Sequence, residues 1–541
     1  MAQTHNYMGE KPVGHYSAMD TQRTYSMVSN EGFYALVPHP YRTYYRRFVQ
    51  EALRWYDGYV PWFHTQQGGI FSTKLAFTVI HKLARLISGG KMIFDNGKLD
   101  QNKQIKFRGK EYGALDFIEM LSSRQNWSSK SKIAMEYAMA AGDSLLKLDN
   151  VNGEIKVDVF RKDGYFFSTD FRGEITDATI FLTQYTQVNT ESHEELFYLL
   201  EERRYNENGK PQVRLTAKKG TAHNIYQTDL SLDTETMKWQ EIPGRVRKQI
   251  KKDYPSAQLG VWKDLPLKNL GVFVVKNTEK VSFMPSLPYG ESILHNSMSI
   301  LMSYDYYFSA MNTDLYTGRA RVLMPKPMQA AVKQQKQQFS GFDDYIMQKV
   351  SYTDPKNQKP EPIQFDLRAQ DWKEIRNILL QTLSTNLGVN ERTIANYLVP
   401  SAEKPTAHEI SSEENDTTAL AEEKRVFLKN AWDLLIETVL DFYGIGDQEV
   451  EVRFSRAGLT NFANVVQQVT VLRNHRLIDL WTAIGMIFFD KSNKEKERIY
   501  YAIKEEEKSQ EQVEEITDLE KEDEKYYSRS LSQVEQNEEE Q

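Results

Sequence analysis

Residues 371–388 read DWKEIRNILLQTLSTNLG, and residues 407–443 read AHEISSEENDTTALAEEKRVFLKNAWDLLIETVLDFY. In the first stretch, apolar residues recur at steps of three and four, which predicts an amphipathic helix of roughly 25 Å. They are Trp372, Ile375, Ile378, Leu379, Leu383 and Leu387. Gly388 stands where a helix is expected to end, and Asp371 with Glu374 predicts a capping pair at its start.

The second stretch predicts a single helix on the order of 50 Å long, because it holds no proline or glycine before Gly444. Its second half carries an apolar stripe of Leu420, Phe427, Ala431, Leu434, Leu435, Val439 and Phe442. Residues 409–424 are nearly all polar, so this half is expected to bury little within its own subunit. We favour packing against copies of the same chain, and the alternative is a solvated surface helix.

Composition and length limit the class of protein. The chain has 541 residues and no cysteine, which excludes disulfides, thiolate metal sites and cysteine nucleophiles. The Tyr-rich N-terminus lacks the layout of a signal peptide, and no run approaches the ~20 apolar residues of a membrane span. We therefore expect a soluble particle component or a soluble enzyme.

Charge is unevenly distributed along the chain. The net charge is −7; residues 505–541 hold 15 acidic and 4 basic residues, a balance of −11, so residues 1–504 carry +4 (−7 minus −11). A near-neutral body predicts no dense basic face of the kind that holds DNA tightly. The acidic tail indicates a solvated segment, although a specific partner is the alternative.

The N-terminal half changes its period once. Helices are expected at 43–56, 72–88, 114–122 and 127–141. From residue 145 the period becomes two, which predicts an antiparallel sheet module with strands near 155–159, 165–168, 178–185, 195–204 and 212–216, and a further strand at 270–275. Asp163-Gly164 and Asn208-Gly209 predict hairpins, and Arg172-Gly173 predicts a turn.

A second long helix of roughly 40 Å is expected from Gly290 to Gly318. Short strands are expected at 321–324, 345–350 and 363–365, and a Gln-rich segment near 330–339 lies among them. A long helix, a small mixed module and a returning helix therefore follow one another.

Enzyme motifs are lacking in the sequence. Gly-Lys pairs such as Gly90-Lys91 have neither the upstream glycine nor the following Ser or Thr of a phosphate-binding loop. His193-Glu194 has no second histidine at zinc-binding spacing, and Gly290-Glu291-Ser292 lacks the second glycine of a nucleophile elbow. Asp343-Asp344 is better explained as an exposed turn than as a metal site. We expect no catalytic residue, no cofactor and no metal.

The order of elements resembles the portal proteins of tailed bacteriophages. Two motifs carry the resemblance: Pro288-Tyr289-Gly290-Glu291-Ser292 before the first long helix, and Thr406-Ala407-His408-Glu409-Ile410 at the start of the longest one. The likeness covers roughly residues 72–474. It implies an α+β portal fold with long stem and wing helices, an antiparallel β wing module, a small α/β clip and a helical crown.

Laid on this chain, the resemblance implies nine segments. They are an N-terminal extension (1–40), a wing of helices and sheet (41–289), a stem helix (290–318), a clip (319–367), a second stem helix (368–389), a tunnel loop (390–406), a long wing helix and strand (407–453), a crown (454–504) and an acidic tail (505–541).

The resemblance also implies site residues. In the tunnel loop the expected DNA-channel residues are Arg392, Asn396, Tyr397, Leu398 and Lys404. Lys404 repeated around a ring would form a positive collar, although a solubility role fits it equally; Tyr397 and Leu398 would face DNA or pack on the next subunit. The clip residues expected to meet the packaging motor and adaptors are Lys326, Lys333, Lys336, Asp343 and Asp344.

The implied function is that of a ring, of twelve copies as expected for the family, at one capsid vertex. It would conduct double-stranded DNA inward and outward, dock the terminase motor and the head-tail adaptors, contact the major capsid protein and scaffold, and nucleate procapsid assembly. It would lie in the virion after assembly in the host cytoplasm, with no membrane partner. The alternatives are another oligomeric virion protein of the capsid or connector, or a nucleic-acid enzyme. Residues 1–40 and the tail are hypothesised to be capsid-contacting or assembly segments.

Overall fold

The structure is a computed structural model, and it describes most of the chain. The described residues are 37–58, 71–89, 91–96, 103–188, 194–222, 230–232, 237–317, 321–325, 346–349, 361–363, 368–390, 394, 407–446, 449–454, 462–506, 508 and 525, apart from 38, 152, 255–257, 489–490, 492 and 494. Helices and mainly antiparallel strands make it an α+β protein, as predicted. No helix among these residues is long and apolar enough to cross a membrane.

The chain divides into two compact units. The first comprises residues 1–84, 133–149 and 158–428, and the second comprises residues 85–132, 150–157 and 429–541. Each unit is therefore built from segments that lie far apart in the sequence. The first unit contains the two helices that the sequence predicts as a stem.

The largest sheet of the first unit is antiparallel, with strand order β10-β9-β8-β7-β6. The strands are β6 (Tyr165–Thr169), β7 (Ile175–Val188), β8 (Glu194–Tyr205), β9 (Pro211–Ala222) and β10 (Leu230–Leu232), and β11 (Lys263–Asp264) pairs with β9. Gly173 and Gly209 have φ values of +87° and +72° in the turns between these strands, which confirms both predicted turns.

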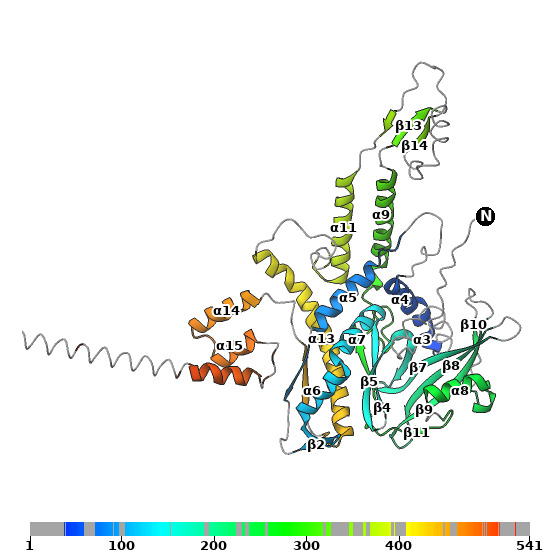
Figure 1. Ribbon diagram of the computed structural model, residues 1–541, viewed down its shortest axis with the longest axis vertical. Coiled ribbons are helices and arrows are strands. Elements are labelled where there is room, and N and C mark those ends of the chain that lie inside the picture. The colour runs from blue at the N-terminus through cyan, green and yellow to red at the C-terminus, as the bar shows by residue number, and fades with distance from the viewer. Residues whose placement is uncertain are drawn as a thin grey trace, which may run out of the picture. The chain divides into compact units, whose positions relative to one another are not determined.

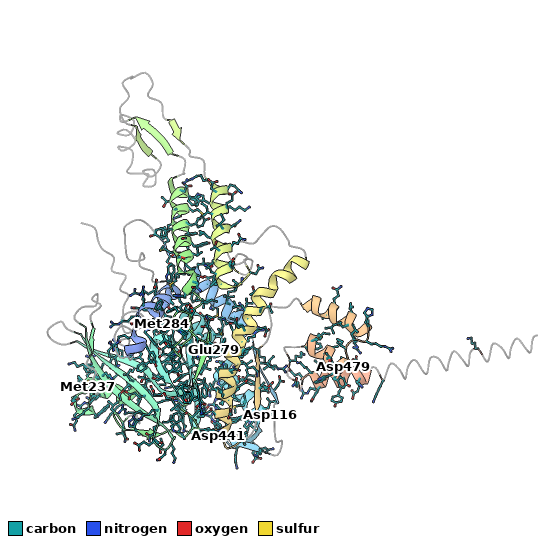
Figure 2. The ribbon with its side chains drawn as sticks, turned by 180° about the vertical axis from the view of Figure 1, so that it is seen from behind. Asp116, Met237, Glu279, Met284, Asp441 and Asp479 are labelled. Carbon is teal, nitrogen blue, oxygen red and sulfur yellow. The ribbon has the colours of Figure 1, made fainter. Side chains whose placement is uncertain are left out.

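A basic helix that the sequence reading missed covers part of this sheet. Helix α8 (Gly244–Asp253) buries Val246 and Ile250 against Tyr185, Phe197 and Leu199 of the strands. Met237, labelled in Figure 2, packs at the edge of the same cluster. The helix is short, and only two apolar residues, Val246 and Ile250 at i and i+4, indicate it in the sequence.

A second sheet has the order β12-β4-β5, formed by β4 (Asp143–Val151), β5 (Glu154–Arg161) and β12 (Val272–Lys276). The hairpin predicted at Asp163-Gly164 is wrong. Residues 162–164 form a buried 3-10 turn that connects β5 to β6, and these strands belong to different sheets. The physical reason is that the side chains of Lys162 and Asp163 are buried in ion pairs, which hold the connection inside the protein.

The predicted N-terminal helices are confirmed. Residues 39–57 form α3 (His39–Tyr44), a π-helical turn (Tyr45–Val49) and α4 (Gln50–Asp57), and they are followed by α5 (Leu75–Ser88), α6 (Ala114–Gln125) and α7 (Trp127–Ala141). Gly142 ends α7 with a φ of +101°. Residues 1–36 lie outside the described part of the chain.

The two predicted stem helices lie side by side as α9 (Met298–Thr317) and α11 (Ala369–Leu387) (Figure 1). Helix α9 begins at Met298, after a 3-10 turn at His295–Ser297, and not at Gly290 as expected. Helix α11 begins at Ala369 with no capping side chain, so the cap predicted from Asp371 and Glu374 is also wrong. Gly388 ends α11 in the left-handed conformation, as predicted.

Between these helices in sequence, the predicted clip contains a small sheet of order β14-β13-β15. Strand β13 (Arg321–Pro325) runs parallel to β14 (Ile346–Lys349) and antiparallel to β15 (Glu361–Ile363). The strands expected at 321–324 and 345–350 are therefore confirmed, whereas the strand expected at 363–365 lies earlier, at Glu361–Ile363. The Gln-rich segment near 330–339 lies outside the described residues.

Helix α13 (Ala407–Phe442) has 36 residues and ends one residue before the predicted end at Tyr443. Its apolar stripe is shifted from the expected one: Leu434 is exposed, whereas Trp432 and Ile436 are buried. The polar half also differs, because Thr417, Lys424 and Arg425 are buried. From Thr417 onward this half therefore buries polar side chains within its own subunit, contrary to expectation.

The second unit pairs β1 (Met92–Asn96) with β16 (Val450–Phe454) and β2 (Gln104–Phe107) with β3 (Lys110–Gly113). The end of α13 packs into it: the Trp127 and Trp432 ring centroids are 5.3 Å apart, and those of Phe117 and Tyr443 are 4.8 Å apart. Helices α14 (Phe462–Asn474) and α15 (Leu480–Ile487) lie in segment 454–504, which was expected to be helical. Asp479, labelled in Figure 2, caps α15 by accepting from the Thr482 amide at 3.0 Å.

Candidate functional site: the α9–α11 pair and its buried base

The ten site residues proposed from the sequence all lie outside the described residues. They are Arg392, Asn396, Tyr397, Leu398 and Lys404 of the predicted tunnel loop and Lys326, Lys333, Lys336, Asp343 and Asp344 of the predicted clip. Two residues of the predicted tunnel loop, Asn390 and Ile394, are described. Ile394 is buried, and the amide of Asn390 donates to Thr417 Oγ1 at 2.9 Å, which ties the end of the α11 segment to α13.

Helices α9 and α11 are joined at the end nearest the clip by hydrogen bonds around Trp372. Tyr307 donates its hydroxyl proton to the Trp372 carbonyl at 2.8 Å, and Trp372 Nε1 donates to Asp314 at 2.9 Å. Arg368 pairs with the same carboxylate at 3.1 Å. The hydrogen bonds from Arg368 and Trp372 lower the pKa of Asp314. This contact fixes the relative register of the two helices.

Helix α9 is also tied to the segment before α5. The amide and hydroxyl of Thr73 both donate to Asp305 Oδ1, at 2.9 and 2.7 Å, and the amide of Phe71 donates to Ser309 Oγ at 2.8 Å. Asn386 of α11 donates to the Asn296 carbonyl at 3.1 Å. These bonds hold the lower part of both helices to the body of the first unit.

The outer faces of the pair expose large apolar side chains. On α9 and α11 the exposed residues are Met302, Tyr306, Phe308, Leu315, Ile375 and Ile378, and Ile378 reaches 62% exposure. Leu383 and Leu387 of the predicted stripe are buried, whereas Ile375 and Ile378 of the same stripe are exposed. Single exposed apolar residues are common, whereas six on two adjacent helices indicate an interaction surface.

At the base of the pair, the chain that leads into α9 touches the end of α7. A Cβ placed on Gly290 would lie 2.2 Å from the Gly142 carbonyl oxygen, and a Cβ on Gly142 would lie 2.2 Å from that of Gly290. Two backbones can approach this closely only where neither residue has a side chain. Gly290 of the Pro288–Ser292 motif is therefore required for backbone packing.

A buried ion pair holds the same point. Lys162 Nζ donates to both oxygens of Asp143, at 2.6 and 2.8 Å, and both side chains are fully buried. Asp143 also accepts from Tyr165 and, at 3.1 Å, from the amide of Gly290. Burial lowers the pKa of Lys162 to about 7, although the neighbouring Asp143 opposes that shift.

Aromatic rings enclose this pair. Lys162 Nζ lies 3.4 Å from the centroid of the Tyr289 ring, which stacks on Tyr44 at 5.6 Å and meets Tyr45 edge to face. Tyr289 donates to the Phe167 carbonyl at 2.8 Å, and Tyr44 donates to the Gly290 carbonyl at 2.6 Å. Burial raises the pKa of Tyr44, Tyr45 and Tyr289 well above the usual value.

The remaining residues of the motif also bind the core. Ser292 Oγ donates to the Ala140 carbonyl at 2.7 Å, and the amide of Ile293 donates to Met139 at 3.0 Å. Glu291 accepts from the amide of Ser282 at 2.8 Å. The segment that was predicted to open a helix therefore anchors the approach to α9 along the end of α7.

A second buried charge cluster stabilises the sheets. Glu201 accepts from Lys147 at 2.9 Å and from Arg203 at 2.6 Å, and Arg203 also binds Asp149 at 2.7 Å. Burial opposes the charge of Glu201, but Arg203 and Lys147 outweigh it and lower its pKa to about 2. The cluster is a structural network, since each charge has an opposite partner within hydrogen-bonding distance.

The arrangement at the base supports positioning of the helices. Among the residues that the structure describes, no three His, Asp or Glu side chains gather as a metal-binding group. The sequence reading missed Asp143 and Lys162, because Lys162-Asp163-Gly164 resembles a surface turn. Only the neighbouring Tyr165 and the apolar strand 155–159 hint at a buried position.

Comparison with known proteins gives one family. A family model described as "Phage portal protein, SPP1 Gp6-like" matches residues 76–523, most of the chain. No curated protein matches the chain.

Proposed function

Since this chain belongs to the SPP1 Gp6-like family of phage portal proteins, we propose that it forms a ring at one capsid vertex through which double-stranded DNA is packaged and ejected. Phage portal proteins are structural components of the virion, and we infer the same role for this chain. The ring, its channel and its docking surfaces are the proposed part.

The observation that carries the proposal is the exposed apolar face of the α9–α11 pair. Six large apolar side chains on these helices remain 40–62% exposed among the described residues. Burying apolar surface is favourable by about 25 cal/mol per Å², so copies of the chain gain free energy by covering these faces mutually. In a closed ring every copy makes the same contact with its neighbours, because a head-to-tail interface that closes leaves no face uncovered at a free end.

The clip and the tunnel loop are assigned by their position between described elements. We propose that the small sheet β13–β15 and the clip residues Lys326, Lys333, Lys336, Asp343 and Asp344 meet the terminase motor and later the head-tail adaptors. The loop 390–406, which follows α11, would line the channel with Arg392, Asn396, Tyr397, Leu398 and Lys404. Weak phosphate contacts there would permit DNA to slide.

The test is the mass and symmetry of the purified protein, by native mass spectrometry and negative-stain averaging. Twelve chains of 63.0 kDa give ~0.76 MDa (12 × 63.0 kDa). A ring of about that mass with an axial hole supports the proposal. A species that stays monomeric in the presence of capsid and scaffold proteins contradicts it, and an oligomer without an axial hole favours another oligomeric virion component.

A further inference from the structure

Helix α8 concentrates positive charge that the net charge of the chain conceals. Its ten residues, GRVRKQIKKD, contain five cations and one carboxylate, a balance of +4 (5 − 1). Residues 1–504 together carry the same +4, so the remainder of that part is neutral. A local field of this kind is invisible in a sum over the whole chain.

The cations of α8 face outward because its apolar residues face inward. Val246 and Ile250 are buried in the sheet cluster, whereas Arg245, Lys248, Lys251 and Lys252 are exposed and Arg247 is half-buried. Among the described residues, no carboxylate forms an ion pair with these five cations, although Lys251 Nζ lies 5.7 Å from the Trp239 ring centroid.

The two nearest carboxylates in sequence are already engaged. Glu241 accepts from the amide of Lys238 at 2.7 Å, and Asp253 accepts from the hydroxyl of Tyr185 at 3.0 Å. Neither therefore neutralises the outward face through a direct pair. Because α8 is held by two buried apolar residues and by the hydrogen bond from Tyr185 to Asp253, the cations project from a fixed scaffold.

We propose that the outward face of α8 binds the phosphate backbone of double-stranded DNA that is not threaded through the ring. From Arg245 to Lys252 the helix rises roughly 10 Å, a length over which duplex DNA presents about six phosphates. This goes beyond the proposed conduit, because it assigns a DNA contact on the β6–β10 sheet module and not on the channel elements.

The patch fits DNA better than an acidic protein segment. Protein interfaces are centred on exposed apolar or aromatic anchors. Around α8 the candidates Met237 and Trp239 are half-buried against the sheet, so the outward face offers charge without an anchor. Binding through charge alone, independent of sequence, is typical of phosphate recognition.

The experiment uses the full-length protein and a covalently closed DNA circle, which cannot thread through a ring. Binding is measured by mobility shift between 50 and 200 mM salt. Three phosphate contacts at a slope of about −0.9 each predict a roughly 40-fold loss of affinity over that range. A triple variant, Lys248→Gln, Lys251→Gln and Lys252→Gln, should lose most of the binding at 50 mM salt and lower the slope by about 2.7.

The matched control removes the same charge elsewhere. Lys106, Lys110 and Lys156 are exposed in the second unit, and their triple glutamine variant should bind the circle like the unaltered protein. Equal losses in both variants, or no binding of the circle by the unaltered protein, would overturn the proposal. So would binding of poly-glutamate in preference to DNA, which would assign α8 to an acidic partner.

Native mass spectrometry of the same samples separates this inference from the proposed function. If rings form and the circle does not bind, only the α8 assignment fails. If α8-dependent binding occurs without rings, only the conduit fails. Thermal unfolding of the triple variant should match that of the unaltered protein, since exposed Lys→Gln changes on a helix hardly alter stability.

Discussion

The base of the α9–α11 pair and the pair itself are opposite in character. At the base, Gly290 lies against Gly142, and the side chains of Asp143 and Lys162 are fully buried. On the helices above it, Tyr306 and Ile378 are 47% and 62% exposed. The base is complete within one subunit, whereas the outer faces of the pair are not.

This difference separates two kinds of requirement on the sequence. Residues at the base act on the folding of each subunit, because their contacts are internal. Exposed apolar residues of the pair act on association, because the described part of the subunit leaves 40–62% of each side chain exposed. A substitution at the base should therefore change the free energy of unfolding, and one on the outer face should change assembly alone.

The largest effect on folding is expected from Gly290→Ala. The new Cβ would lie 2.2 Å from a backbone oxygen, so the chain must move away from α7 and break the contacts of the motif. We expect a loss of about 4 kcal/mol or more, measured as urea unfolding at fixed protein concentration.

Gly485→Ala is the matched control, since a Cβ there meets nothing within 4 Å and the residue lies in α15. It should be neutral or stabilise by up to about 1 kcal/mol. Equal stability of the two variants would show that the Gly142–Gly290 contact is not required.

Lys162→Met should cost about 3–5 kcal/mol at pH 6, where Lys162 is charged, because it leaves Asp143 as an unpaired buried charge. Adding Asp143→Asn should recover part of the loss. A double variant that is less stable than the sum of the single changes would contradict the ion pair as the cause. Unfolding by urea, followed by tryptophan fluorescence, measures all three proteins.

Because of Glu201, the free energy of unfolding should depend on pH in the acid range. Its pKa is about 2 in the folded protein and 4.5 in the unfolded chain, so the unfolded state binds more protons between these values. The stability that Glu201 contributes is complete above pH 4.5 and is lost as the pH falls toward 2. Urea midpoints across this range should fall less steeply for Glu201→Gln; identical slopes would refute the assignment.

A smaller effect is expected where the two helices join. Trp372→Phe removes the hydrogen bond to Asp314 and keeps most of the ring packing against Tyr307. The expected cost is about 1 kcal/mol. Tyr307→Phe, which removes the hydrogen bond to the Trp372 carbonyl, should cost a similar amount. Thermal unfolding of both variants measures these losses. A loss of more than about 3 kcal/mol in the free energy of unfolding would contradict this and would mean that the contact is as important for folding as those at the base.

The smallest effect on folding, and the largest on assembly, is expected from Ile378→Glu. Because Ile378 is exposed, the subunit should keep its stability within about 0.5 kcal/mol. A buried charge at a contact between copies should prevent ring formation, visible as a loss of the high-mass species in native mass spectrometry. Leu380→Ala, two residues away and buried, should show the reverse: rings of subunits that are about 2–5 kcal/mol less stable.

Much of the fold could be predicted from the sequence where the signal is local. The 36-residue helix α13, the end of α11 at Gly388 and the turns at Gly173 and Gly209 all follow from glycine placement and periodicity. The strands were located, but not their division into two sheets. The connection between the two sheets carries the buried ion pair of Lys162 and Asp143, which are 19 positions apart and leave no pairing signal in the sequence.

The candidate site was less predictable, for the same physical reason. Ile375 and Ile378 have the spacing of a buried stripe, and periodicity cannot tell an internal core from a face that awaits another copy. Gly290 looked like the start of a helix, whereas its role depends on Gly142, which lies 148 positions earlier (290 − 142). Residues that act through distant partners leave no local pattern.

The most direct test of the account is the accessibility of position 378 in assembled and dissociated protein. The chain has no cysteine, so Ile378→Cys introduces a single thiol whose rate of maleimide labelling can be measured. Phe171→Cys, at a position that is 91% exposed, provides the reference. The account predicts that assembly slows labelling at 378 at least tenfold and leaves 171 unchanged. Equal labelling rates at 378 in the assembled and dissociated states would contradict it.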